Sequence, residues 1–256
     1  MYTVPDRPST KLCIGGEFIT KRAFRVFLSY HEAMIDGGPL LVAGAPLSWT
    51  PRLAALAAAA VPLLAADGGA DHLALLGLRP AAVIGDLDSI NRETRSWLGE
   101  ESLIERPDQN RTDLDKALEY AFDDLGVERL TVLAAVGGRL DHDLGNLGLL
   151  ARLAMGERLI FEGDDHRVLA VAGEATLAAQ SGETWSFWTY DPSVRVTIDG
   201  VRYSIENAAI DAGGRPSISN QAVGDLVRVQ TTGGAVIVMR RVGDPGGQSK
   251  GLRVKG

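Results

Sequence analysis

Short apolar runs alternate with helical stretches through the first half of the chain. The strand-like runs are separated by segments long enough to form helices. The predicted strands are Leu40–Ala43, Val61–Ala65, Ala81–Ile84, Leu103–Ile104 and Leu130–Ala134; the predicted helices are Pro51–Ala60, Ala70–Leu76, Arg92–Leu98, Asp113–Leu125 and Asp143–Met155. Such alternation indicates an α/β domain with a parallel sheet, Rossmann-like and three-layered, with helices on both faces.

The pattern changes near residue 159. Beyond it, short apolar runs are spaced by turns rich in Gly, Pro, Asn and Asp, which is typical of an antiparallel sandwich. These runs are Leu159–Phe161, Val168–Val171, Ala175–Leu177, Thr184–Trp188, Val194–Ile198, Leu226–Gln230 and Ala235–Met239. We therefore expect an N-terminal appendage (residues 1–37), an α/β domain (38–158) and an all-β sandwich domain (159–256).

Composition limits the classes of partner. The 256 residues include 45% hydrophobic and 23% charged residues, enough to bury a core, and the net charge of −7 argues against nucleic-acid binding. The apolar run Leu53–Ala66 is too short to span a membrane and contains Pro62. A single cysteine, Cys13, cannot form an internal disulfide or a zinc site, and no basic-then-apolar leader is visible. We expect a cytoplasmic protein without a membrane or nucleic-acid partner.

Aspartates concentrate at the predicted strand ends. Of 20 Asp residues, 11 lie between Asp67 and Asp143. Because the carboxyl ends of parallel strands meet at one edge of a sheet, four polar turns should share one crevice. Such crowding of carboxylates is costly without a cation, and Mg²⁺ prefers oxygen ligands together with substrate phosphates. The four turns are DGGAD from Asp67, GDLDS from Gly85, DQNRTD from Asp108 and GGRLDH from Gly137.

Two of these turns also have ordinary structural interpretations. Asp86 and Asp88 can aim at one ion, or their turn can simply cap the helix near Asn91. The turn Asp67-Gly68-Gly69 also has two interpretations. It resembles a backbone nest that binds phosphate or ribose, but Gly-Gly after a strand is common in proteins without such a ligand.

Thr112 is expected to cap a helix, with Asp115 three residues later as in a capping box. Asp113 and Lys116 then share a helix face, either as a metal ligand beside a phosphate contact or as an ordinary ion pair. Lys116 is the only lysine between residues 22 and 249.

The fourth turn offers Arg139 for bidentate phosphate contact, followed by Asp141 as a possible helix cap and His142 as a possible ligand. P-loop, dinucleotide, nucleophile-elbow and HExxH motifs are absent from the sequence. The residues therefore indicate Mg²⁺-dependent chemistry on a phosphorylated substrate, with a nucleotide favoured.

The motifs, in this order, resemble those of the thiamine pyrophosphokinase family. DGGAD, GDLDS, DQNRTDLDKA, GGRLDH and a C-terminal Ser219-Asn220 match its pattern across about Leu40 to Met239. The resemblance implies transfer of diphosphate from ATP to the hydroxyethyl group of thiamine, giving thiamine diphosphate and AMP. It also implies an α/β domain, a β-sandwich, and a homodimer whose sites are shared between subunits.

The resemblance further implies roles for individual residues. Asp86, Asp88 and Asp113 correspond to Mg²⁺ ligands and, with Lys116, to the catalytic set, while Ser219 and Asn220 correspond to the thiamine-binding pair. The ATP or diphosphate contacts that it implies are Asp67, Gly68, Gly69, Gln109, Thr112, Arg139 and Asp141, with Lys116 among them.

Thiamine's cationic aromatic ring also favours an aromatic wall, for which Tyr203, Trp185 and Trp188 are candidates. The two tryptophans are three positions apart, so on a strand they face opposite sides, and core packing is the favoured interpretation for each.

Asn110 stands where the family pattern has a second Asp, which removes a charge. Two alternatives stay open: a diphosphokinase acting on another hydroxymethyl heterocycle such as a pterin, or a retired relative that binds thiamine or nucleotide as a sensor.

Overall fold

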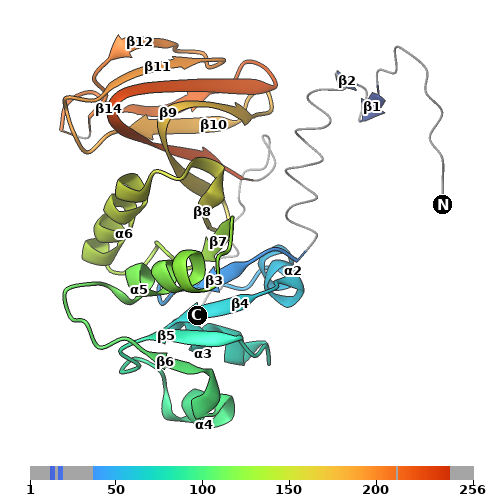
Figure 1. Cartoon of the computed structure of the whole chain (residues 1–256). Coiled ribbons are helices and arrows are strands. Elements are labelled where there is room, and N and C mark those ends of the chain that lie inside the picture. The colour runs from blue at the N-terminus through green and yellow to red at the C-terminus, as the bar shows by residue number, and fades with distance from the viewer. Residues whose placement is uncertain (1–11, 15–16, 20–36, 212, 243–256) are drawn as a thin grey trace, which may run out of the picture.

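The computed structural model of the chain describes residues 12–14, 17–19, 37–211 and 213–242 (Figure 1). Its first half contains a parallel sheet built from short, mostly buried apolar strands, the pattern expected when helices cover both faces. The strands are β3 (Leu40–Val42), β4 (Leu63–Ala66), β5 (Ala82–Gly85), β6 (Leu103–Glu105), β7 (Leu130–Leu133) and β8 (Leu159–Glu162). They pair in the order β8-β7-β3-β4-β5-β6.

Helices pack on both faces of this sheet. They are α2 (Pro51–Ala59), α3 (Gly69–Leu75), α4 (Arg92–Leu98), α5 (Asp113–Glu119), which continues as the π-helical turn η2 (Tyr120–Asp124), and α6 (Leu140–Leu153). Side chains of α2, α3 and α4 share one buried cluster with the sheet, and those of α5 and α6 share another. This confirms the three-layer α/β architecture.

The second half is a β-rich layer built around two long strands. Its strands are β9 (His166–Ala178), β10 (Thr184–Trp188), β11 (Arg195–Asp199), β12 (Ile205–Ala208), β13 (Ser217–Gln221) and β14 (Leu226–Arg241). β9 and β14 pair antiparallel along most of their length, and β10 and β11 flank β14. β9 also pairs with β8, so the strands continue from the parallel sheet into the β-rich layer (Figure 1).

Alternation along the strands connects the two halves. On β9, Val168 packs into the core shared with α5 and α6, whereas Leu169 packs into the core of the β-rich layer. On β10, Trp185 is buried in the latter core and Trp188 packs against the former. Successive side chains of a strand point to opposite faces, so one set of strands serves two cores. The opposite orientation of the two tryptophans is confirmed.

Three details differ from the sequence-based expectation. Leu159–Phe161, which the boundary at residue 159 placed in the sandwich, pairs in parallel with β7 and belongs to the α/β sheet. The runs on either side of Gly173 form one strand, as do Leu226–Gln230 and Ala235–Met239. β12 and β13 were not predicted, because Asn, Glu and Ser dilute their apolar pattern.

Of the predicted N-terminal appendage, the described residues comprise β1 (Leu12–Ile14) and β2 (Glu17–Ile19), which pair antiparallel; its other residues up to 36 lie outside the described ranges. None of the helices in the described ranges combines the length and apolar character that a bilayer crossing requires.

Candidate active site

A cleft of about 800 Å³ opens at the carboxyl ends of β3, β4 and β7. The N-terminal ends of α3, α5 and α6 and Ser89 of the turn after β5 reach the same cleft, so five segments that are distant in sequence meet there. This is the edge at which open α/β sheets bind ligands. Its polar lining residues are Asp67, Asp71, His72, Ser89, Asp113, Arg139, His142, Asp143 and Asn146.

The turn after β5 brings two carboxylates together. Leu87, between Asp86 and Asp88, has a φ of +63° and a buried side chain, an uncommon conformation for a branched residue. Asn91 itself caps α4, its side chain accepting the Thr94 amide at 2.8 Å. The Asp86–Asp88 turn is therefore not needed as that helix's cap, although both carboxylates accept hydrogen bonds within the turn, from the Asp88 amide and the Ser89 hydroxyl.

Asp67 completes a group of three carboxylates with Asp86 and Asp88. One oxygen of each lies within 4.8 Å of one oxygen of the others. Asp67 is only 3% exposed: its Oδ2 accepts the Ser89 amide at 3.2 Å, while its Oδ1 is buried without a hydrogen-bond partner. Burial, aided by the nearby charges of Asp113 and Asp86, raises the pKa of Asp67 above its ordinary value.

This arrangement fits a divalent cation. A buried carboxylate oxygen without a partner is costly, and a cation removes that cost while offering the charge that crowded carboxylates lack. Gly85 makes the close approach possible, because a Cβ there would lie 2.9 Å from Asp67 Cβ and 3.0 Å from Asp113 Oδ1. An oxygen-only donor set of this kind suits Mg²⁺ better than zinc or copper.

Asp113 stands beside the three carboxylates. Its Oδ1 accepts the Asp86 amide at 3.2 Å and the Lys116 ammonium at 3.0 Å. Lys116 is 3% exposed and the Asp113 side chain 31%, so the ammonium is buried beneath a carboxylate that lines the cleft, unlike a solvated pair on a helix surface. The pair brings one positive charge next to three neighbouring carboxylates.

The loop before α5 reaches the same group. Gln109 Nε2 donates to Asp86 Oδ2 at 3.2 Å, and this hydrogen bond lowers the pKa of Asp86. Thr112 caps α5, its hydroxyl accepting the Asp115 amide at 3.2 Å, as predicted. Asn110 is exposed, and its amide and side-chain nitrogen both donate to Asp108 Oδ1 within the loop.

The turn after β7 is held by a residue that sequence analysis did not select. Asp143 Oδ1 accepts the amides of Gly137 and Gly138 at 3.0 and 3.3 Å. Arg139 and Asp141 are both exposed and pair at 2.6 Å, and this pairing lowers the pKa of Asp141 to about 2. α6 starts at Leu140 with Arg139 at the N-cap position and no side-chain cap hydrogen bond, so the expected helix cap at Asp141 is wrong.

Two of the three C-terminal candidates, Tyr203 and Asn220, line another pocket of about 400 Å³ beside β12 and β13, whereas Ser219 is not among its lining residues. Asn220 is buried: its Oδ1 accepts the Tyr203 and Gln221 amides, and its Nδ2 donates to Tyr203 O at 2.8 Å. Ser219 is exposed with a φ of +57°, and Tyr203 is exposed at the pocket. Asn220 therefore fixes the turn that presents Tyr203.

Comparisons with known proteins identify the family. Residues 53–161 match the family model "Thiamin pyrophosphokinase, catalytic domain" and residues 174–236 match "Thiamin pyrophosphokinase, vitamin B1 binding domain". Thiamine pyrophosphokinase 1 of Arabidopsis thaliana is 32% identical over 197 residues, covering 66% of this chain and 73% of that protein. The chain belongs to the thiamine pyrophosphokinase family.

Two other family members match this chain over different lengths, one by sequence and one by fold. Thiamine pyrophosphokinase 1 of Oryza sativa subsp. japonica is 28% identical over 165 residues, which cover 59% of this chain and 62% of that protein. The crystal structure of the Bacillus subtilis thiamine pyrophosphokinase has a TM-score of 0.68 at 22% identity and covers 80% of this chain and 99% of that one, a likeness of fold. None of these names favours a pterin enzyme or a retired sensor.

In this member of the thiamine pyrophosphokinase family, the predicted site residues lie in two separate places. Asp67, Gly68, Asp86, Asp88, Gln109, Asp113, Lys116, Arg139 and Asp141 lie in or around the cleft, whereas Tyr203, Ser219 and Asn220 lie in the β-rich half. Gly69 is buried, and a Cβ at this position would lie only 2.0 Å from Val42 O. The close packing of α3 on β3 therefore requires glycine here.

Some site residues escaped sequence analysis. His72 Nε2 lies 2.9 Å from Ala45 O and links α3 to the turn after β3. Asn146, a buried polar residue on α6, donates to Ala135 O at 2.7 Å. A polar residue within the apolar spacing of a helix was the available signal for Asn146; for His72 and Asp143 the signal was only their proximity to a recognised motif.

Proposed function

We propose that this chain transfers diphosphate from ATP to thiamine, giving thiamine diphosphate and AMP. The observation that carries the proposal is the meeting of Asp67, Asp86 and Asp88 with the Asp113–Lys116 ion pair in one cleft. The family membership supplies the substrate class, since the chain matches both a catalytic and a vitamin B1 binding domain.

We assign Mg²⁺ to the three grouped carboxylates. Asp67, Asp86 and Asp88 would hold it, with Asp113 alongside. Bound Mg²⁺ supplies positive charge that offsets the charge of the ATP phosphates. Arg139 is exposed and lines the cleft, where it can contact the transferred phosphates. We assign a second phosphate contact to Lys116, whose ammonium is buried beside the cleft and paired with Asp113.

The chemistry itself needs little from the protein beyond positioning. The thiamine hydroxyl oxygen attacks the β-phosphorus in line with the oxygen that bridges the α- and β-phosphorus. A new O–P bond forms as that bridge breaks at the β-phosphorus, the bridging oxygen leaves with AMP, and the hydroxyl proton passes to a base in the cleft. Orientation of the two substrates and neutralisation of charge account for most of such a rate.

Thiamine is assigned to the pocket beside β12 and β13. Tyr203 is the exposed candidate that lines this pocket, and the buried Asn220 fixes the Tyr203 turn by hydrogen bonds to its backbone. An aromatic ring suits the cationic heterocycle. In Figure 1, β12 lies far from β5 and β6. Within one chain, the proposed thiamine pocket is therefore distant from the carboxylates that follow β5.

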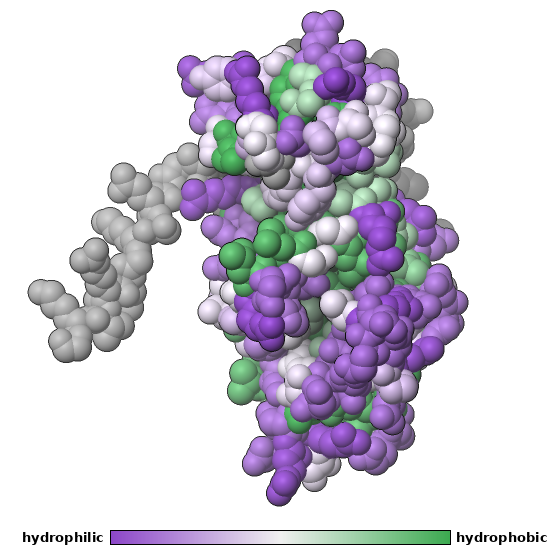
Figure 2. Space-filling model, turned by 90° about the vertical axis from the view of Figure 1, so that its left-hand side faces the viewer, coloured by the Kyte–Doolittle hydropathy of each residue, from purple (hydrophilic) through white to green (hydrophobic). Residues whose placement is uncertain are grey.

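A homodimer reconciles these positions, because the β-rich half of one copy can meet the cleft of the other. α6 offers an apolar surface for this contact: Leu140 is 72% exposed and Leu144 53%, and Tyr190 is exposed next to Leu144. Figure 2 looks onto this side of the molecule and shows apolar surface at the height of α6, between more polar regions. Exposed apolar patches of this kind mark interaction surfaces.

Product analysis tests the proposal. ATP, thiamine and Mg²⁺ should yield AMP and thiamine diphosphate in equal amounts; ADP as the nucleotide product would indicate an ordinary kinase instead. Asp86→Asn should reduce turnover by about two orders of magnitude or more, because a metal site typically supplies several kcal/mol at about 1.4 kcal/mol per tenfold. Asp199→Asn, at an exposed position on β11, is the matched control and should retain activity.

A further inference from the structure

The loop between β6 and α5 is exposed, yet it must hold Gln109 in place against Asp86. Residues 107–110 are all exposed. At its beginning, the Arg106 amide donates to Gly85 O at 2.7 Å, which fixes the loop to the end of β5. At its tip, Asp108 Oδ1 accepts both the amide and the side-chain nitrogen of Asn110, which closes the turn locally without attaching it to the rest of the protein.

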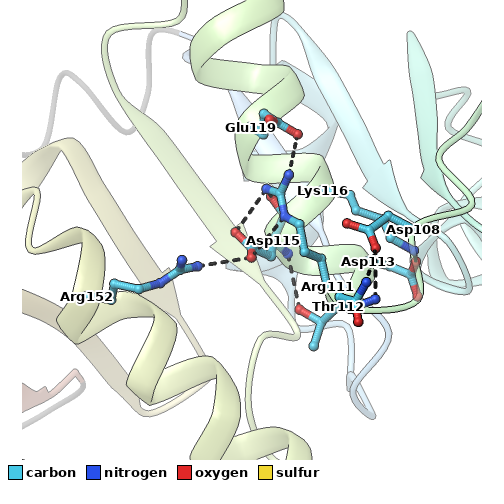
Figure 3. Close-up of polar contacts among 9 residues, drawn as sticks. Asp108, Arg111, Thr112, Asp113, Asp115, Lys116, Glu119 and Arg152 are labelled. Atoms are coloured by element: carbon cyan, nitrogen blue, oxygen red, sulfur yellow. Dashed lines mark hydrogen bonds and ion pairs between the residues drawn. The ribbon is translucent and has the colours of Figure 1, made fainter.

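Arg111 attaches the far end of this loop. Its guanidinium lies along the outer face of α5 and makes four hydrogen bonds (Figure 3). Nε and Nη2 each donate to one carboxylate oxygen of Asp115 at 3.2 Å, and Nη2 also donates to Asp115 O. Nη1 donates to Glu119 Oε2 at 2.7 Å. The bidentate geometry fixes the direction of the side chain as well as its distance.

Asp115 connects this attachment to another helix. Arg152, in the last turn of α6, donates to Asp115 Oδ2 at 3.0 Å (Figure 3). Asp115 is half-buried beneath the two arginines, whereas Arg152 is largely exposed. The side chain of Asp115 is thus shared between the loop that carries Gln109 and the helix whose first turn carries Asp141 and Asp143.

We propose that Arg111 is a positioning residue, which holds the loop of residues 106–112, and with it Gln109, against Asp86 of the carboxylate group. This rests on the cation site assigned under the proposed function. Arg111 acts through the backbone and through Gln109, without contacting the cation or the substrates.

The test uses Mn²⁺ as the probe and the full chain without nucleotide. Calorimetric titration of Arg111→Ala should show Mn²⁺ affinity weakened by about three- to tenfold, less than the roughly 10–100-fold typical of residues bonded directly to a metal ligand, because Arg111 acts one step further away. Hydrogen exchange of the amides of residues 109–112 should accelerate in the same variant. Arg111→Lys, which keeps one ion pair, should fall in between.

Arg152→Ala is the matched control, because it removes the other partner of Asp115 and leaves the loop attached; its Mn²⁺ affinity should stay within about twofold of the wild type. Unchanged loop exchange in Arg111→Ala overturns the proposal, and so does faster exchange with unchanged Mn²⁺ affinity, which would make Arg111 a structural tether only. An equal loss of affinity in both variants also overturns it. If the wild-type chain binds no Mn²⁺, the assigned cation site fails, whereas loop exchange still tests the attachment by Arg111.

Discussion

The Lys116 ammonium lies 3.0 Å from Asp113 Oδ1, and Lys116 is almost completely buried. The same carboxylate oxygen accepts the Asp86 amide, so a single atom links helix α5 to the turn after β5. The pair therefore has two consequences: it places a fixed positive charge beside the carboxylate group, and it holds Asp113 in a defined orientation next to Asp67.

Lys116→Met should impair both ATP use and stability. The substitution keeps most of the buried volume but leaves Asp113 without its ion-pair partner, which should cost about 1–3 kcal/mol of unfolding free energy. The KM for ATP should rise more than the KM for thiamine, because the phosphate-facing charge is lost. Denaturant unfolding and steady-state kinetics measure the two effects; an unchanged ATP dependence would leave Lys116 with a structural role alone.

Asp67→Asn should stabilise the metal-free protein while weakening its response to Mg²⁺. Because the folded-state pKa of Asp67 is raised by burial, the folded state holds the proton more tightly than the unfolded state. The stability that Asp67 contributes is therefore fully present below its unfolded pKa and is lost as the pH rises through its folded pKa.

At pH 7 without Mg²⁺ the Asn variant should accordingly melt about 2–4 °C higher than the wild type, equivalent to about 1 kcal/mol, and this difference should shrink toward pH 4. Mg²⁺ should raise the Tm of the wild type and have little effect on the variant. Thermal unfolding at several pH values, with and without Mg²⁺, provides the measurement. If Mg²⁺ raised the Tm of the variant as much as that of the wild type, Asp67 would be excluded from the cation site.

Asn220→Ala and Ser219→Ala should separate stability from binding. Asn220 is 2% exposed and its side chain bonds to the backbone of Tyr203 and Gln221, so its loss should cost about 2–3 kcal/mol. Ser219 is exposed, so its variant should unfold like the wild type and lose thiamine affinity. Chemical denaturation and thiamine titration of both variants give the comparison; full thiamine affinity in Ser219→Ala would contradict the thiamine-binding role that the family motif implies for Ser219.

Leu144→Glu should dissociate the proposed homodimer. A charged side chain on the exposed apolar surface of α6 opposes its burial between two copies. Analytical ultracentrifugation should find the wild type at twice the chain mass of 27.2 kDa and the variant at the chain mass. Leu75→Glu, at a 77% exposed position at the end of α3, is the control and should remain dimeric. A monomeric wild type would contradict the proposed homodimer and the proposal that its sites are shared between subunits.

Much of the fold follows from local pattern. The apolar runs that became β3, β4, β5 and β7 are short and buried on both faces, and the polar breaks between them coincide with the loops. β8 was misplaced because a short apolar strand has the same local pattern in a parallel sheet and in a sandwich. Only its partner, β7, decides which sheet it joins.

The candidate site was predictable as a set of motifs and not as a geometry. The order of the Asp-bearing turns indicated one crevice, and the structure brings Asp67, Asp86 and Asp88 within reach of one ion. The sequence offered the pairing of Asp113 with Lys116 as one alternative, but it could not show that Lys116 is buried or that Asn220 is occupied by backbone bonds. The burial of Lys116 and the bond from Asn220 to Tyr203 depend on contacts between segments distant along the chain.

The sequence by itself determined the alternation of strands and helices, the change to a β-rich half, and which turns carry carboxylates, because each depends on spacing and residue type over a few positions. The tertiary structure alone decided how far each carboxylate is buried, which oxygen of Asp67 lacks a partner, and that Arg111 and Arg152 meet on Asp115. Burial and pairing are properties of packing, since desolvation and electrostatic interaction are set by neighbours in space and not by neighbours in sequence.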